Sequence, residues 1–364
     1  MFVISGHLQP YAWGRDGGLN PWLNSPTGGP QAELWFGAHP NGPSPLVGRP
    51  GTLADVAAPG DVPLLVKLLA AGRPLSIQIH PDAELAQQLW AAGSELVADD
   101  GEKVELLLAL EPFSIFAGWR DEQQAAALLR ATDPSLEPAA QAVEFDDVGA
   151  AVRFLLASSS AEVARLTPAL LAALANEGID DEQIHSFALA AESFPGDAGL
   201  LVLLLMDHHE LASHSAVYMP AGGVHAYAQG FGVEVMTASD NVLRLGLTPK
   251  PLAVEQALQA VNPNGDPHFI GGEIYTAHGR PTVTEYRPHH APFAVDLVHD
   301  TEFASPQGSY RCVVAVRGQT LVRCGGEERE LAQGQACAVL AEEDEIHIGT
   351  GGMAVVVEAR EYRR

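Results

Sequence analysis

The segment Pro74–Asp82, with the sequence Pro-Leu-Ser-Ile-Gln-Ile-His-Pro-Asp, limits the fold more than any other stretch of this chain. In a β-strand, successive side chains point to opposite faces of the sheet. One face of this strand would hold Leu75, Ile77 and Ile79, and the other would hold Ser76, Gln78 and His80. The first face suits a hydrophobic core, and the second suits the wall of a metal-binding cavity. A half-exposed polar strand fits the same pattern, so the metal interpretation requires further ligands elsewhere in the chain.

A second candidate strand, residues 101–110, offers one such ligand. Lys103, Glu105 and Leu107 share a face if this strand alternates. A carboxylate is costly to bury among aliphatic side chains unless a cation is its partner. That cation can be a metal ion shared with Gln78 and His80, which lie about 6.5–7 Å apart along a strand. It can equally be the ammonium group of Lys103.

A third candidate ligand, His225, lies in the Pro-x-Gly-x-x-His motif of residues 220–225. Residues 216–230 read as a strand, a tight glycine turn and another strand, which would hold His225 at the mouth of a β-barrel, pointing inwards. Residues 232–236 alternate again, so Glu234 is a candidate inward-facing acid. In contrast, we expect His208 and His209 to lie in a polar, solvent-exposed turn.

The remaining patterns predict the other elements. Residues 1–60 are rich in Gly and Pro, which favours short strands and turns, with Trp13 and Trp35 as packing anchors. Residues 62–69 read as a strand that forms a hairpin with Pro74–Asp82, and residues 83–98 as a helix. From Asp121 to Ala191, apolar residues recur at helical spacing and predict a helical subdomain. Its expected role is to wall one side of a cleft.

Composition restricts the classes of ligand. The formal net charge is −26, from 46 acidic and 20 basic side chains, which argues against nucleic acid or an anionic membrane as partner. The longest apolar run, Leu200–Met206, is too short to span a bilayer, and the N-terminus does not resemble a signal peptide. Three cysteines with no metal-site spacing predict no disulfide framework. We expect a soluble, cytoplasmic protein.

Several ordered motifs carry a resemblance to a known family. They are Pro-Leu-Ser-Ile-Gln-Ile-His-Pro at 74–81, Lys-x-Glu at 103–105, Pro-Ala-Gly-x-x-His-Ala-Tyr at 220–227 and Ser-Asp-Asn-Val-x-Arg-x-Gly-x-Thr-Pro-Lys at 239–250. Tyr-Ala-Trp-Gly at 11–14 and Ala-Glu-Leu-Trp-x-Gly at 32–37 add to them. Together these motifs resemble type I mannose-6-phosphate isomerase, whereas the C-terminal part matches only in its general β pattern.

The resemblance implies a mainly β fold with a helical insertion. We expect two cupin-like β-barrel (jelly-roll) domains and a small α-helical subdomain. The catalytic cupin domain would comprise residues 1–120 and 196–265, the helical subdomain residues 121–195, and the C-terminal cupin-like domain residues 266–364. The C-terminal domain has neither a Gln-x-His nor a Pro-x-Gly-x-x-His motif, so we expect it to hold no metal.

The function implied is zinc-dependent interconversion of D-mannose 6-phosphate and D-fructose 6-phosphate through a cis-enediol. One Zn²⁺ per chain would be bound, a small phosphorylated sugar would be the partner, and no obligate protein partner is inferred. The zinc ligands carried over by motif position are Gln78, His80, Glu105 and His225. Such a set leaves room for a water or substrate oxygen.

The remaining site residues follow from the same motifs. The substrate-binding candidates are Ser76, Lys103, Tyr227 and Lys250. The catalytic candidates are Arg244, Asp240, Glu234 and Lys103, of which the family motif surrounds the first two. Arg244, Lys103 and Lys250 are also the cations that would hold a phosphate in so acidic a chain.

The sequence departs from the family pattern at two positions, and two other functions remain open. Glu102 and Val104 stand where the family commonly has histidine and proline, which leaves substrate preference open. His80, Glu105 and His225 could also form the iron triad of a metal-dependent cupin oxygenase, although Gln78 and the cations argue against it. The second alternative is a non-catalytic sugar-phosphate-binding cupin.

Overall fold

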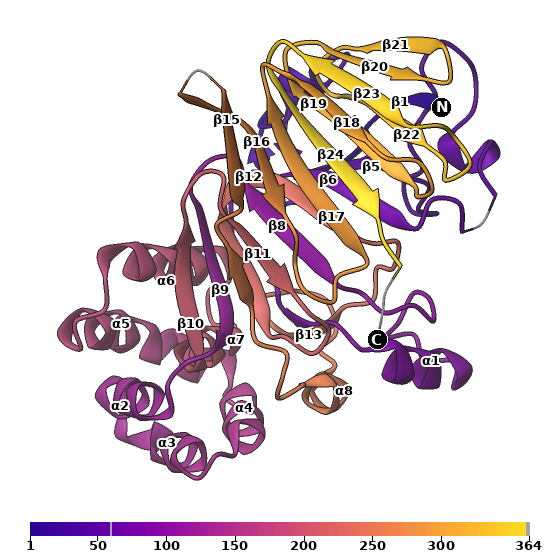
Figure 1. Ribbon diagram of the computed structural model, residues 1–364. Coiled ribbons are helices and arrows are strands. Elements are labelled where there is room, and N and C mark those ends of the chain that lie inside the picture. The colour runs from indigo at the N-terminus through magenta and orange to yellow at the C-terminus, as the bar shows by residue number, and fades with distance from the viewer. Residues whose placement is uncertain (59, 278, 362–364) are drawn as a thin grey trace.

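The computed structural model describes residues 1–58, 60–277 and 279–361. The described chain is mainly β, with stacked sheets and a group of helices at one side (Figure 1). The 11-stranded sheet contains β2 (His7–Gln9), β5 (Glu33–Phe36), β6 (Leu64–Ala71), β7 (Ile77–Ile79), β8 (Glu105–Ala109), β9 (Phe113–Trp119), β10 (Met206–Leu211), β11 (Ala216–Met219), β12 (His225–Thr237), β13 (Leu243–Gly246) and β14 (His268–Ile270).

Two further large sheets and one two-stranded pair make up the rest of the described β structure. The seven-stranded sheet contains β1 (Phe2–Ser5), β15 (Glu273–Ala277), β16 (Arg280–Tyr286), β17 (Phe293–His299), β19 (Arg311–Arg317), β22 (Gln335–Val339) and β24 (Met353–Ala359). The four-stranded sheet contains β18 (Glu302–Ser305), β20 (Thr320–Cys324), β21 (Glu327–Leu331) and β23 (Ile346–Thr350). A small pair is formed by β3 (Arg15–Asp16) and β4 (Pro30–Gln31).

Strand β12 organises the 11-stranded sheet. Its first residues pair with β7 and β9, whereas the rest of the strand pairs with β6 and β8. The two groups of strands enclose a small core that includes Leu69, Leu107, Phe113 and Tyr227. Because β12 runs along both groups, side chains from distant parts of the sequence meet between them.

The predicted hairpin between residues 62–69 and Pro74–Asp82 is wrong. β6 and β7 each pair with β12 and not with each other. The chain between them is held elsewhere, since the amides of Gly72 and Arg73 donate to the carbonyl of Trp13. Regular pairing in β7 begins only at Ile77, so the predicted alternation does not extend back to Leu75. Leu75 therefore packs against the small core and not with Ile77 and Ile79.

The helical insertion is confirmed. It contains α2 (Glu122–Thr132), α3 (Glu137–Glu144), α4 (Val148–Leu156), α5 (Ser160–Asn176) and α6 (Asp181–Ser193). Side chains of Asp121, Asp147, Ser159 and Asp180 cap the first amides of four of these helices, which is why each begins where it does. Outside the insertion lie α1 (Ala83–Ala91), α7 (Gly199–Val202) and α8 (Val254–Ala260). No described helix has the length and apolar character needed to cross a membrane.

His208 and His209 do not lie in an exposed turn. They belong to β10, which pairs with β9 at the boundary between the sheet and the helices. His208 is half-buried, and its Nε2 lies 3.0 Å from Oγ of Ser186 on α6. The segment is polar in sequence, but tertiary packing of α6 covers it.

His208 should make stability depend on pH. Burial lowers the pKa of His208 to about 4. The unfolded chain, with an ordinary histidine pKa of about 6.5, then binds more protons than the folded chain between these values, so stability falls with falling pH. We expect the loss attributable to His208 to reach about 2 kcal/mol at pH 5. Urea unfolding at pH 7.5 and pH 5 measures it, and His208→Asn should show a smaller loss than the unmodified chain. Equal losses would contradict the prediction.

Sheet pairing joins the N-terminal strand to the C-terminal sheet. One core lies between the 11-stranded and seven-stranded sheets and includes Val66, Val235 and Val355. Another lies between the seven-stranded and four-stranded sheets and includes Val313 and Val322. β1, from the extreme N-terminus, pairs with β22 and so belongs to the sheet that is otherwise C-terminal. The three cysteines are free and buried.

Candidate metal centre and substrate cavity

Neighbouring strands bring four of the predicted ligands to one place. Gln78 on β7 lies directly opposite His225, the first residue of β12. His80 follows the last residue of β7, and Glu105 begins β8. Gly222, with φ of +84°, makes the turn before β12, and an added Cβ there would lie 2.4 Å from Cβ of Asn262. The glycine of the Pro-x-Gly-x-x-His motif is therefore required by both the backbone conformation and the packing.

His80, Glu105 and His225 form a compact, fully buried group. Nε2 of His80 lies 3.2 Å from Oε2 of Glu105, and Nε2 of His225 lies 3.2 Å from Oε1 of the same carboxylate. Candidate ligand atoms of the three residues lie within 4.8 Å of one another. Lys103 Nζ also contacts Glu105 Oε2, at 3.1 Å. The ammonium partner and the possible metal partner for Glu105, which the sequence left as alternatives, therefore occur at the same carboxylate.

The hydrogen bonds of the histidines suit a cation. Nδ1 of His80 lies 2.9 Å from the carbonyl of Asn241, and Nδ1 of His225 lies 3.1 Å from the carbonyl of Gly223. A carbonyl only accepts, so each Nδ1 carries a proton, and Nε2 is the ring atom left to bind a metal ion. Both Nε2 atoms are buried without a hydrogen-bond partner, and Oε2 of Glu105 is buried in its ion pair with Lys103. Three acceptors facing one another are stabilised by a metal ion, so the residues present fit one.

Charge at this group is set by its surroundings. Burial by itself would raise the pKa of Glu105, but Lys103 and the two histidines together outweigh burial and hold this pKa well below its usual range. Burial and Lys103 lower the pKa of His80 to about 3. The group is thus an anionic carboxylate flanked by a neutral imidazole, which is the protonation state that a metal ion requires.

Tyr227 orients the carboxylate. Its hydroxyl is fully buried and donates to Oε1 of Glu105 at 2.6 Å. Burial and the nearby carboxylate of Glu105 raise the pKa of Tyr227 well above its usual value, so the phenol stays a donor. Tyr227 does not line the cavity described below, so this position gives it contact with Glu105 and not with a ligand in the cavity.

Tyr227→Phe should weaken metal binding without unfolding the protein. The substitution removes one hydrogen bond to Glu105 while keeping the ring against Phe113. Partners of metal ligands typically account for about 10- to 100-fold in affinity, and we expect a loss in that range. Competition with a chromogenic chelator measures it. Tyr286→Phe is the matched control, because it removes a hydrogen bond to the carbonyl of His214, and it should leave metal affinity unchanged. Equal affinity in Tyr227→Phe and the unmodified chain would contradict this role.

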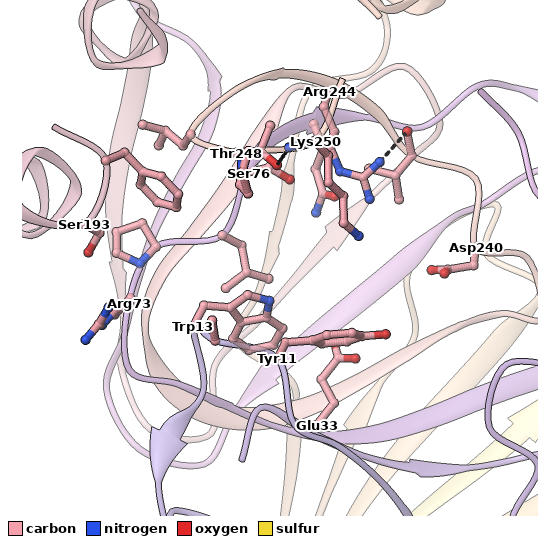
Figure 2. A pocket seen from close by; sticks show the side chains of 18 of the residues that line it. Tyr11, Trp13, Glu33, Arg73, Ser76, Ser193, Asp240, Arg244, Thr248 and Lys250 are labelled. Carbon is pink, nitrogen blue, oxygen red and sulfur yellow. Dashed lines mark hydrogen bonds between the residues drawn. The ribbon is translucent and has the colours of Figure 1, made fainter. Parts of the chain in front are cut away.

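A cavity of about 390 Å³ opens above the metal-ligand group. Gln78 and Lys103 line it, and both also adjoin that group. Figure 2 shows the side chains that converge on it from the N-terminal loops, from the strands and from the end of α6. Other lining residues are Tyr11, Trp13, Glu33, Lys67, Arg73, Ser76, Ser193, Phe194, Glu234, Asp240, Arg244, Thr248 and Lys250.

Several of the predicted site residues therefore share one cavity. The cavity lining brings together predicted site residues that are far apart in sequence, namely Ser76, Glu234, Asp240, Arg244 and Lys250. Trp35 is a packing anchor as expected, buried with its indole N–H donating to Glu33 at 2.7 Å. Trp13 packs against the small core, and both tryptophans line the cavity. The lining contains Lys103 but not the neighbouring Glu102.

Lys67 is a site residue that sequence reasoning missed. It is buried on β6, with Nζ 2.5 Å from Oε2 of Glu234 and 3.6 Å from Oε1 of Glu33. Burial would lower the pKa of Lys67, but the two carboxylates raise it overall, so it stays charged. A signal was present, since a single lysine within the otherwise apolar strand Leu64–Ala71 requires acidic partners. Glu234, predicted as an inward-facing acid, is one of them.

Unlike Lys67 and Glu234, Asp240 and Arg244 are not held in an ion pair with a described residue. The guanidinium of Arg244 makes a long hydrogen bond to the carbonyl of Val242, at 3.4 Å, and no ion pair with any described carboxylate. The carboxylate of Asp240 points into the cavity (Figure 2). Burial would raise the pKa of Asp240, but Lys103 and Lys67 outweigh burial and lower it. Arg244 therefore offers a cation, and Asp240 an ionised acid, to a molecule in the cavity.

Comparison with known proteins adds independent evidence. Residues 1–122 match the family model of the phosphomannose isomerase type I catalytic domain. The chain is 30% identical to mannose-6-phosphate isomerase from Salmonella typhimurium, covering 98% of this chain and 99% of the relative, and 28% identical to the Escherichia coli protein over the same shares.

Solved structures agree with the sequence relatives. A single-residue variant of phosphomannose isomerase from Salmonella typhimurium superposes with a TM-score of 0.84 at 25% identity, covering 99% of this chain and 100% of the other. A mannose 6-phosphate isomerase bound with zinc and yttrium superposes with a TM-score of 0.82 at 26% identity, over 99% and 100% of the two chains. The resemblance predicted from the motifs is thereby confirmed. With such identity along two nearly complete chains, the protein belongs to the mannose-6-phosphate isomerase family.

Proposed function

We propose that this chain interconverts D-mannose 6-phosphate and D-fructose 6-phosphate, using one zinc ion held by Gln78, His80, Glu105 and His225. The observation that carries the proposal is the meeting of two kinds of group in one place. The buried group of His80, Glu105 and His225 adjoins, through Gln78 and Lys103, a cavity that is lined by Arg244 and Lys250. The buried group suits a divalent cation, and the cations suit the phosphate of a sugar.

The donor set favours zinc. Two imidazole nitrogens and a carboxylate are common zinc ligands, and the amide oxygen of Gln78 is a further donor opposite His225. A related mannose 6-phosphate isomerase is described as bound with zinc. When bound, zinc would polarise an oxygen of the substrate and stabilise negative charge there. Tyr227 then serves as the residue that orients Glu105, a different role from the substrate contact predicted for it.

The phosphate would bind at the side of the cavity formed by Ser76, Arg244 and Lys250. All three line the cavity, and Figure 2 shows them near one another. Lys67 and Lys103 are less suited, because each already has a carboxylate within 3.1 Å. Arg244 has no such partner, and its planar guanidinium matches the geometry of a phosphate.

The reaction needs a group that removes a proton beside the carbonyl and returns it to the neighbouring carbon, through a cis-enediol. Asp240 is our first candidate, since it is ionised and faces the cavity without an ion pair among the described residues. Glu234 is less available because Lys67 holds it. Lys103 is the remaining candidate and contacts Glu105. Arg244 would stabilise the charge that develops during this transfer.

Asp240→Asn separates these candidates. If Asp240 carries the proton, we expect kcat to fall by about 10²- to 10⁴-fold, the usual contribution of a general base. Zinc content should be unchanged, because Asp240 is not one of the four ligands. Exchange of the substrate C2 hydrogen with deuterated water, followed by nuclear magnetic resonance, should slow in parallel. If exchange continues at the normal rate, the proton acceptor is another residue.

We infer that the 11-stranded sheet corresponds to a cupin-like barrel around the metal centre, and that residues 266–364 form a second cupin-like unit. Enclosure of a small core between two groups of strands supports the first unit. Packing between the seven-stranded and four-stranded sheets supports the second, which also takes in β1 from the N-terminus.

A coupled assay tests the function. The purified, zinc-loaded protein should convert mannose 6-phosphate to fructose 6-phosphate, which glucose-6-phosphate isomerase and glucose-6-phosphate dehydrogenase report as NADPH. Binding of the sugar phosphate without turnover would instead favour a sugar-phosphate-binding protein. Tight iron content with oxygen consumption would favour a cupin oxygenase.

A further inference from the structure

An aromatic surface lies beside the cations of the cavity. Tyr11 and Trp13 come from the loop between β2 and β3, and their ring centroids are 5.9 Å apart with planes inclined by 31°. Both line the cavity. Figure 2 shows the two rings on the opposite side of the cavity from Arg244 and Lys250. A molecule held by those cations would therefore present its remaining atoms to the rings.

These aromatic rings are not simply part of the core. Tyr11 is 37% exposed, whereas Trp35, in the neighbouring aromatic motif, is 1% exposed and has its indole N–H bonded to Glu33. Trp13 is half-buried, with one side against the small core and the other at the cavity. An exposed aromatic side chain on a cavity wall retains apolar area that a ligand can cover.

The backbone that carries the rings is firmly held. The carbonyl of Trp13 accepts hydrogen bonds from the amides of Gly72 and Arg73, and the carbonyl of Tyr11 accepts one from Gly14. Gly14 packs so closely that an added Cβ would lie 2.4 Å from the backbone nitrogen of Ala32. The backbone that carries the rings is therefore ordered before any ligand binds, which reduces the entropy lost on binding.

We propose that Tyr11 and Trp13 form a platform for the carbon-bound hydrogens of the sugar, with the Tyr11 hydroxyl donating to a sugar hydroxyl. This inference rests on the proposed function for the identity of the ligand, a hexose phosphate. A sugar has an apolar C–H surface and a polar rim, which an aromatic ring with a hydroxyl complements. Burial raises the pKa of Tyr11 to about 12, with Glu33 adding to the effect, so the hydroxyl remains a donor at neutral pH.

The platform recognises the sugar, whereas the cations recognise the phosphate. Tyr11→Leu should therefore raise KM for mannose 6-phosphate by about 3- to 10-fold, the range typical of aromatic contacts. Because the contact is made equally in the ground state and the transition state, kcat should change by less than about twofold. Tyr11→Phe keeps the ring and should give a smaller increase in KM. Inhibition by inorganic phosphate, which has no carbon surface, should keep the same inhibition constant in all these variants.

A second measurement does not depend on turnover. Fructose 6-phosphate added to zinc-free protein should alter tryptophan fluorescence, and Trp13→Phe should abolish the change. Trp90→Phe is the matched control, because Trp90 is 51% exposed on α1 and does not line the cavity, and it should keep the change. Tyr275→Leu is the corresponding control for Tyr11→Leu, since Tyr275 is 46% exposed on β15.

Three results would contradict the proposal that Tyr11 and Trp13 bind the sugar. An unchanged KM in correctly folded Tyr11→Leu would do so, as would an inhibition constant for phosphate that rises as much as KM does. Persistence of the fluorescence change in Trp13→Phe would do so as well. Failure of the proposed function looks different, because the unmodified protein would then not isomerise mannose 6-phosphate, while the fluorescence titration would still report whether hexose phosphates cover Trp13.

Discussion

Replacing His225 with alanine should remove zinc binding and isomerase turnover together. His225 presents Nε2 to Glu105 at 3.2 Å and has its Nδ1 fixed by the carbonyl of Gly223, so no other described side chain can take its place at the same point. Without it, the proposed centre keeps one imidazole, one carboxylate and one amide. A metal ion supplies several kcal/mol of stabilisation to developing negative charge, so its loss should lower kcat/KM by about 10³-fold or more.

The experiment compares metal content with activity in the same preparation. Elemental analysis after gel filtration gives zinc per chain, and the coupled assay gives kcat/KM. His289→Ala is the matched control, because His289 is an exposed histidine outside the cavity, and both quantities should stay normal. Circular dichroism checks that His225→Ala retains its fold, and His225→Gln provides a less disruptive variant. Full turnover in a zinc-free His225→Ala protein would refute the proposed metal centre.

Local patterns in the sequence predicted most of the elements but not their neighbours. The helical subdomain of residues 121–191 and the strands on both sides of the 220–225 motif are where the apolar spacing placed them, although α3 was not predicted. The hairpin was wrong because alternation shows which residues share a face and cannot show which strand pairs with them. The partner of both β6 and β7 is β12, which begins at His225, far along the chain. The pairing of β1 with β22 could not be read from local pattern for the same reason.

At the candidate site, the sequence likewise predicted the residue types but not the surroundings of each side chain. Motif positions predicted that Gln78, His80, Glu105 and His225 could share an ion, and the structure brings the last three within 4.8 Å at their ligand atoms. What the sequence did not reveal was burial. Tyr227 is a polar residue in a cavity motif, yet its hydroxyl is buried against Glu105. Trp13 resembles Trp35 in sequence, yet only Trp35 is fully enclosed. Such differences depend on side chains packed from distant segments.

The buried network around Lys67 makes the cavity suited to the anion proposed above, in a chain with a net charge of −26. Glu33 and Glu234 both line the cavity, but Lys67 lies against both carboxylates. Lys103 similarly balances Glu105. The charges that remain without an ion pair among the described lining residues include the cations Arg244 and Lys250, so the local field at that side of the cavity favours a phosphate.

Arg244 is therefore the residue whose loss should separate metal binding from turnover. Arg244→Ala should keep zinc, because the histidine and carboxylate ligands are untouched, and should lower kcat/KM by about 10²- to 10³-fold, as expected for a positioned charge that stabilises an anion. Arg244→Lys should recover only part of this, since an ammonium cannot form the paired hydrogen bonds of a guanidinium. Lys250→Ala should cost less, because Lys250 is exposed and its charge is screened by water.

The role of Arg244 is tested by measuring kcat/KM and zinc content in these three variants. The expected order of kcat/KM is unmodified protein, Lys250→Ala, Arg244→Lys and Arg244→Ala, with zinc content equal in all four. Loss of zinc in Arg244→Ala would show that this residue supports the metal centre through Gln78, which lies opposite it on β7. Normal turnover in zinc-loaded Arg244→Ala would remove Arg244 from the proposed mechanism. The phosphate and the developing charge would then have to be held by the remaining lysines, although two of the lysines in the cavity are already paired with carboxylates.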